Sequence, residues 1–143
     1  VFKTELGNFL LSVKNGKIIK LYPTNSSTTH TFYKENYYIE KNICDYLKKK
    51  SKLHDFTLEP VGTIFEKKIW EEIKRIYYGK TISYKKIANK FKTSPRAVGN
   101  ACSNNTCLFL IPCHRVIKSD GKIGNYLMGK KIKEFLINLE FEN

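Results

Sequence analysis

The sequence predicts an α+β protein in two parts, a small α/β lobe over residues 1–60 and a mainly helical domain over residues 61–143 with a winged helix-turn-helix-like pattern. Apolar and polar residues first alternate around Asn15-Gly16, which is typical of a β-hairpin. After Gly62 the apolar residues recur at helical spacing instead. A length of 143 residues suits one domain with a small companion.

The first lobe is expected to contain three strands, a helix and a short fourth strand. Asn15-Gly16 favours a type I′ turn, and strands are expected near Phe2–Leu6, Phe9–Val13 and Lys17–Tyr22. A helix near Glu35–Lys50 is predicted by the spacing of Ile39, Ile43, Tyr46 and Leu47. A short strand is expected at Phe56–Glu59. This lobe offers no catalytic constellation.

The second part begins with a capped helix. Thr63 and Glu66 have the spacing of a capping box. The apolar stripe of this helix comprises Ile64, Phe65, Ile69, Trp70, Ile73 and Ile76. We expect the helix to end at Tyr78-Gly79-Lys80.

Two short helices joined by a tight polar turn follow, which is the helix-turn-helix pattern. Ser83 can cap the first, the break falls at Lys92–Ser94, and Pro95 opens the second. Apolar contact between the two is expected from Ile87, Ala88, Phe91 and Val98. A hairpin across Asp120-Gly121 would serve as a wing. The final helix, Gly129–Glu140, has a stripe made of Ile132, Phe135, Leu136 and Leu139.

The charge distribution indicates a polyanionic partner. The formal net charge is +13, and residues Ile73 through Ser119 include ten Lys or Arg but no Asp or Glu. Such a one-signed surface attracts polyanions, with nucleic acid the leading candidate. The alternative is a solubilising surface, because Lys outnumbers Arg 23 to 3.

Hydropathy and cysteine usage indicate an intracellular protein. No run of about 18 or more uncharged apolar residues occurs, and no basic segment followed by an apolar one marks the chain for secretion. We therefore expect a soluble protein of the cytoplasm, or of the nucleus in a eukaryote. Its thiols should stay reduced, and Cys44, Cys102 and Cys107 are expected to be small buried hydrophobes.

The stretch LFLIPCHRVIK, Leu108 to Lys118, places Cys113, His114 and Arg115 together among apolar residues. A cysteine is reactive as thiolate, which a nearby histidine or cation favours. His114 could act through a water, since adjacent side chains need not face each other. The alternative is a buried thiol beside a structural histidine. A metal site is disfavoured because the cysteine spacings are unlike paired C-x-x-C ligands.

The final helix offers a partner for the imidazole. With 3.6 residues per turn, Glu140 lies about 40° from Leu136 around the helix axis, and Glu134 lies about 160° away. Glu140 therefore borders the buried stripe and could reach His114. Glu134 is expected to be a solvated surface charge.

The motifs IPCHRVI and GNY, preceded by ISYKKIA and SPRAVGNA, resemble the O6-alkylguanine-DNA alkyltransferase family. The resemblance covers Thr63 to Glu140, in family order and spacing. It implies that the first lobe is ribonuclease H-like and that the second part is the catalytic and DNA-binding domain. It also implies a monomer without cofactor or metal that flips O6-alkylguanine out of double-stranded DNA and keeps the alkyl group irreversibly, acting once.

The resemblance assigns roles to the residues that match its motifs. Cys113 would be the nucleophile, His114 the base acting through water, and Glu140 its orienting partner. Tyr84 would assist nucleotide rotation and donate a hydrogen bond to the base ring nitrogen. Asn105 matches the hinge asparagine between the recognition helix and the catalytic segment.

Further roles concern DNA and the pocket. Arg96 matches the arginine that fills the gap left by the flipped nucleotide, or it makes an ordinary phosphate contact; Arg115 resembles a buried structural arginine. Other DNA contacts are expected from Tyr84, Ala97, Gly99, Lys85, Lys86, Ser94 and Ser103, with Lys90 and Lys92 on the backbone. The alkylated base would be flanked by Tyr126, Val116, Leu127, Met128 and Leu108.

Departures from the family pattern bear on substrate breadth. Leu127-Met128-Gly129 stands where the family usually has Ser-Gly-Gly, Leu108 replaces a frequent proline, and Asn100 replaces a small residue. Methyl transfer is expected to remain. Two other classes are a damage sensor without transfer activity, which would lack the cysteine at position 113, and a Cys-His hydrolase, which would not explain the basic helix-turn-helix.

Overall fold

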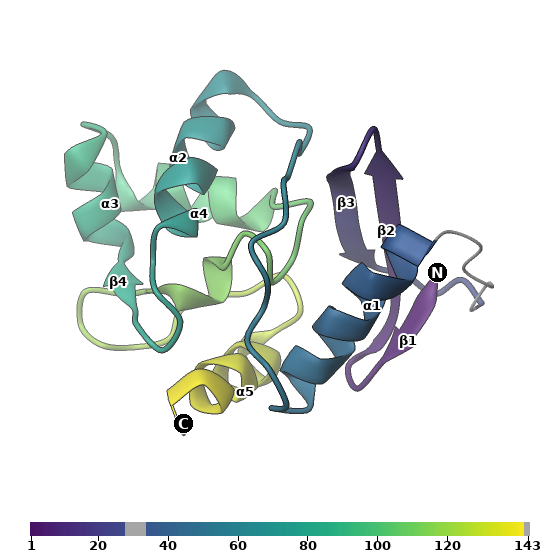
Figure 1. The fold of residues 1–143 in the computed structure, drawn as a ribbon. Helices are drawn as coiled ribbons and strands as arrows, with labels where there is room; N and C mark the ends of the chain where they lie inside the picture. The colour runs from purple at the N-terminus through teal and green to yellow at the C-terminus, as the bar shows by residue number, and fades with distance from the viewer. Residues whose placement is uncertain (28–33, 142–143) are drawn as a thin grey trace. The chain divides into compact units, whose positions relative to one another are not determined.

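The computed structural model describes residues 1–27 and 34–141. Its contacts divide the chain into two compact units, Val1–Val61 and Gly62–Asn143 (Figure 1). Both helices and small sheets occur in the described residues, which confirms the predicted α+β class. No helix in this part of the chain is long and apolar enough to cross a bilayer.

The first unit is built on a three-stranded antiparallel sheet in the order β1-β2-β3. The strands are β1 (Phe2–Thr4), β2 (Gly7–Lys14) and β3 (Lys17–Pro23). Asn15 and Gly16 both have positive φ, at 52° and 75°, as a type I′ turn requires. A register shift between Ser12 and Val13 marks a bulge beside that turn.

One helix, α1 (Lys34–Leu47), packs against β1 and β2. Its predicted apolar stripe is buried, with Ile43 and Tyr46 fully enclosed together with Phe9 of the sheet. The predicted strand at Phe56–Glu59 is reduced to a single parallel bridge between Ile18 and Leu58. This unit therefore buries a small core under one face of its sheet.

The second unit begins with α2 (Ile64–Lys74), whose predicted capping box is confirmed. The Glu66 amide donates to Thr63 Oγ1 at 3.1 Å, and Glu66 Oε1 accepts from the Thr63 amide at 2.9 Å. The helix ends earlier than predicted. The prediction that Ile64 and Phe65 belong to the buried stripe is wrong: they are 79% and 38% exposed, because the first turn of α2 points away from the core.

The predicted helix-turn-helix pair is present as α3 (Tyr84–Lys90) and α4 (Pro95–Ser103), which pack on each other. Ser83 Oγ accepts from the Lys86 amide, and Ser94 Oγ accepts from the Ala97 amide, so both helices are capped at their first turn. The buried Trp70 of α2 donates its indole N–H to the Ala101 carbonyl at 2.8 Å. This bond ties the C-terminal half of α4 to α2.

The predicted wing hairpin forms only as a turn. Asp120 and Gly121 do reverse the chain, with the Lys118 amide donating to the Lys122 carbonyl at 2.9 Å. No strand follows this turn in residues 34–141. Instead β5 (Val116–Ile117) pairs in parallel with β4 (Ile82–Ser83), so the strand before the turn is hydrogen-bonded to a strand outside the predicted hairpin.

The last helix, α5 (Lys130–Phe141), buries a face that differs from the predicted stripe. Leu136 and Leu139 are buried as expected, but Phe135 is 40% exposed. Lys133, which is outside the predicted stripe, is buried instead and has no exposed surface. The described cysteines are free thiols: Cys107 is fully buried, as predicted, and Cys44 and Cys102 are only half-buried.

Candidate active site

Cys113 lies at the start of the short 3₁₀ helix η1 (Cys113–Arg115), after the buried Ile111-Pro112. Cys113 is only 3% exposed, yet it lines a cavity of about 550 Å³. The other walls come from α3, α4 and the segment that follows β5. The thiol is therefore enclosed on the core side and open toward the helix-turn-helix pair.

The fully buried Asn105 holds the loop that leads to this thiol. Its Oδ1 accepts from the Cys107 amide at 2.9 Å, and its Nδ2 donates to the Ile111 carbonyl at 2.9 Å and to Cys113 Sγ at 3.4 Å. One amide group thus closes the 105–111 loop and contacts the sulfur. A carboxamide is suited to this because it both donates and accepts.

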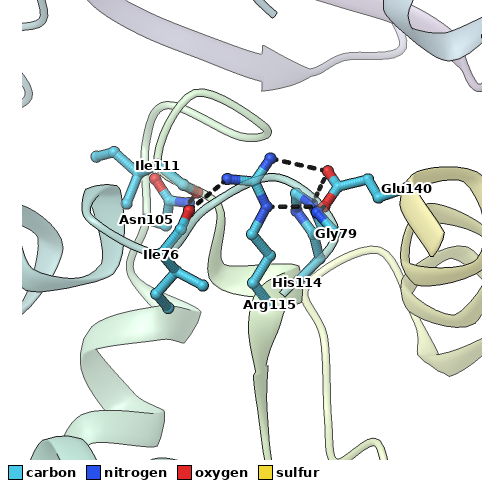
Figure 2. Close-up of polar contacts among 7 residues, drawn as sticks. All are labelled: Ile76, Gly79, Asn105, Ile111, His114, Arg115 and Glu140. Carbon is cyan, nitrogen blue, oxygen red and sulfur yellow. Dashed lines mark hydrogen bonds and ion pairs between the residues drawn. The ribbon is translucent and has the colours of Figure 1, made fainter. Parts of the chain in front are cut away.

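Glu140 gathers the imidazole of His114 and the guanidinium of Arg115 (Figure 2). Its Oε2 lies 2.7 Å from His114 Nε2 and 3.0 Å from Arg115 Nη2, and its Oε1 lies 2.8 Å from Arg115 Nε. Arg115 Nη1 also donates to the Ile76 carbonyl at 2.8 Å. Because all three side chains are buried, these contacts satisfy charges that water does not reach.

The environment sets the protonation of these groups. Burial lowers the pKa of His114 despite its contact with Glu140, which keeps the imidazole neutral near pH 7. Burial opposes ionisation of Glu140, but hydrogen bonds from His114 and Arg115 outweigh it and hold the pKa of that carboxyl well below its usual range. Burial raises the pKa of the Cys113 thiol, so the resting sulfur is protonated.

Lys133 is a site residue outside the set predicted from the sequence. Its ammonium donates to Tyr84 Oη at 3.0 Å, to the Val116 carbonyl at 2.6 Å and to the Asn125 carbonyl at 3.1 Å. Burial lowers the pKa of Lys133 to about 8. With 3.6 residues per turn, Lys133 lies about 20° from Glu140 around the axis, so the spacing that pointed to Glu140 also carried the signal for Lys133.

The cavity brings together many, but not all, of the residues predicted to bind substrate or DNA. Those that line it are Tyr84, Lys85, Arg96, Gly99, Ser103, Tyr126 and Leu127. Tyr126 has a buried hydroxyl with no hydrogen-bond partner among the described residues. Leu108 and Val116 do not line this cavity, since both side chains are packed in the core, and Met128 does not line it either. Their part in a substrate pocket stays a prediction.

The helix-turn-helix pair presents Lys85, Lys86 and Arg96 as exposed cations. Lys90 differs from the expectation of a free DNA contact, because its ammonium lies 2.9 and 2.8 Å from the two carboxylate oxygens of Glu72. Ala97 is half-buried, and an added Cβ at Gly99 would meet nothing within 4 Å. Small residues of α4 therefore lie beside the cavity, and the exposed positive charge comes from Arg96 of α4 and the two lysines of α3.

These features define a class of protein in which the thiol of a buried cysteine faces a cavity beside a basic helix-turn-helix element. The profile of the 6-O-methylguanine DNA methyltransferase DNA-binding domain matches residues 64–142. A relative from Methanosarcina acetivorans, called methylated-DNA--protein-cysteine methyltransferase, is 33% identical over 98% of this chain and 96% of its own length. The chain belongs to the 6-O-methylguanine DNA methyltransferase family.

Two further relatives agree with this assignment. A methylated-DNA--protein-cysteine methyltransferase of Methanosarcina barkeri is 45% identical over 100 residues, which are 68% of this chain and 63% of the relative. The crystal structure of Mycobacterium tuberculosis OGT in complex with DNA superposes with a TM-score of 0.83 at 27% identity, covering 99% of this chain and 91% of that one. The likeness therefore extends over both units.

Proposed function

We propose that this chain is a DNA repair alkyltransferase that moves the alkyl group of O6-alkylguanine, chiefly methyl, irreversibly onto Cys113. The observation that carries the proposal is the position of the Cys113 thiol, which opens into a cavity walled by Lys85 and Arg96. The relatives' shared name supports the same reaction. Cations beside the cavity attract the phosphates of DNA, so the sulfur in the cavity can meet a base of the bound DNA.

The proposed reaction is a direct displacement at carbon. A bond forms between Cys113 Sγ and the alkyl carbon, the carbon–O6 bond breaks, and its electron pair stays with guanine. Because the resting thiol is protonated, a base must take its proton. The neutral imidazole of His114, whose Nε2–H would donate to Glu140 Oε2 at 2.7 Å, carries its lone pair on Nδ1 and would accept this proton through a water.

Tyr84 and Lys133 would act on the departing base. The Tyr84 hydroxyl lines the cavity, and its contact to the Asn125 carbonyl is long, at 3.4 Å. It could therefore turn to donate to a ring nitrogen of guanine, which would help the base leave as a neutral species. Lys133 would hold the Tyr84 oxygen in place through its 3.0 Å hydrogen bond.

Binding of double-stranded DNA would use the helix-turn-helix pair. An alkylated base inside the stack cannot be attacked, so it must be flipped out at a cost of a few kcal/mol. Arg96, exposed at the start of α4, would fill the gap, and Tyr126 in the cavity wall would pack against the flipped base. Lys85 and Lys86 would bind phosphates without sequence preference.

Substrate breadth and setting are further parts of the proposal. The Leu127 side chain lines the cavity and is 39% exposed, so it would restrict alkyl groups much larger than methyl. We further propose a monomer that acts in the cytoplasm, or in the nucleus of a eukaryotic cell.

The direct test uses duplex DNA with one O6-methylguanine. Intact mass spectrometry should show one methyl group gained per protein, located on Cys113, with no further turnover once every protein is labelled. Cys113→Ala should bind this DNA but gain no mass, whereas Cys44→Ala, which removes a thiol from the first unit, should react like the parent protein. Binding without transfer by the parent protein would favour a damage sensor and refute the proposal.

A further inference from the structure

Cys102 is a second thiol at the candidate site, and the proposed alkyl transfer does not use it. It lies in the last turn of α4 and lines the same cavity as Cys113. The two residues line one cavity, and the proximity of Cys102 contributes to raising the pKa of the Cys113 thiol. Two sulfur atoms from separate elements therefore face one space, although eleven positions separate them in the sequence.

We propose that Cys102 and Cys113 form a dithiol site for soft, thiophilic ligands, namely trivalent arsenicals of the type R–As=O. Each thiol would form one As–S bond, the As=O bond would break, and the two thiol protons would leave with the oxygen as one water molecule. Nothing is oxidised or reduced in this exchange. The reaction needs both sulfur atoms and no other reagent.

The surroundings favour this class of ligand over a structural zinc ion. Soft centres select thiolate ligands, whereas a structural zinc ion needs four ligands. In residues 1–27 and 34–141 no group of three or more metal-ligating side chains occurs, so two sulfurs must suffice. An organoarsenical meets this condition because its own organic group occupies the third position. The cavity of about 550 Å³ has room for that group beside Tyr126 and Leu127.

Occupancy of the dithiol would block the sulfur that the proposed function assigns as alkyl acceptor. This consequence rests on the proposed function, whereas the formation of the adduct does not. Methylation would work in the opposite direction. Once Cys113 carries a methyl group it cannot form an As–S bond, so the alkylated protein should lose the site.

The test titrates the reduced full chain with phenylarsine oxide and follows intact mass under native conditions. One phenylarsenic group should be gained per protein, with the loss of two titratable thiols. Since two linked attachments hold a ligand far more tightly than one, Cys102→Ser should need at least about 100-fold more reagent for half-saturation. The matched control is Cys107→Ala, which removes a buried thiol that lies between Cys102 and Cys113 in the sequence, and this variant should bind the reagent like the parent protein.

The results separate this inference from the proposed function. If Cys102→Ser binds as tightly as the parent protein, or if only one thiol is lost per adduct, the dithiol site is refuted. If the adduct forms but the unmodified protein fails to accept methyl from DNA, the proposed function fails and the dithiol site stands. If both hold, the adduct should abolish methyl transfer, and 1,2-ethanedithiol should restore it.

Discussion

Replacing Glu140 with glutamine is expected to lower the free energy of unfolding by about 3 kcal/mol, the lower end of the cost of breaking a buried ion pair. The carboxylate, with a side chain only 2% exposed, has two contacts with Arg115 at 2.8 and 3.0 Å and one with His114 at 2.7 Å. Glutamine keeps one acceptor oxygen but turns an NH₂ group toward these donors. Arg115 would then be a buried charge without its counter-ion.

Urea unfolding followed by circular dichroism measures this loss, and Glu134→Gln on the exposed face of α5 is the matched control. The control should stay within about 0.5 kcal/mol of the parent protein. In a double-mutant cycle, Arg115→Met combined with Glu140→Gln should cost less than the sum of the two single changes, by about 0.5–3 kcal/mol. Equal stability of Glu140→Gln and Glu134→Gln would refute the ion-pair reasoning.

The same variant has a defined pH dependence. The pKa of Glu140 is lowered in the folded state, so the unfolded chain binds a proton first as pH falls below the ordinary glutamate value of about 4.3. The stability that the carboxylate supplies is therefore complete above that pH and is lost below it. The difference between parent and Glu140→Gln should accordingly shrink between pH 7 and pH 3. A difference that grows in acid would contradict this sign.

Two further predictions concern Lys133 and Gly62. Lys133→Met removes the donor that holds Tyr84, so the rate of methyl transfer within the protein–DNA complex should fall at least tenfold while the affinity for DNA stays within twofold. Lys131→Met, a change of an exposed lysine, should alter neither the rate nor the affinity. If Lys133→Met lowers the affinity as much as the rate, Lys133 is merely structural. Gly62→Ala would place a Cβ 2.5 Å from the buried Trp70 ring, which should lower the free energy of unfolding by about 1–3 kcal/mol. A urea titration measures this loss, and an unchanged midpoint would show that the ring shifts freely.

Local signals predicted the capped helices well. Thr63 with Glu66, Ser83, and Ser94 before Pro95 each satisfy amides within a few residues, so their effect depends little on the rest of the chain. The Asn15-Gly16 turn belongs to the same category. The starts of these helices and the position of the hairpin turn could therefore be predicted before any tertiary contact was known.

Long-range contacts decided what the sequence could not. Asp120 and Gly121 form the predicted turn, but pairing of Val116 with Ile82 depends on a strand more than thirty residues away. Helical spacing pointed to Glu140, yet Lys133 on the same face went unnamed because buried lysines are rare. Its burial depends on three oxygen acceptors that only the folded chain brings together.

The bond between Trp70 and the Ala101 carbonyl has a practical consequence. Trp70 is the sequence's one tryptophan, it is 1% exposed, and its indole N–H is engaged by the backbone of α4. Indole emission responds to polarity and hydrogen bonding around the ring, so any displacement of α4 against a duplex would alter the emission spectrum. The protein thus contains a native optical reporter, and DNA docking could be followed in real time without attaching a dye.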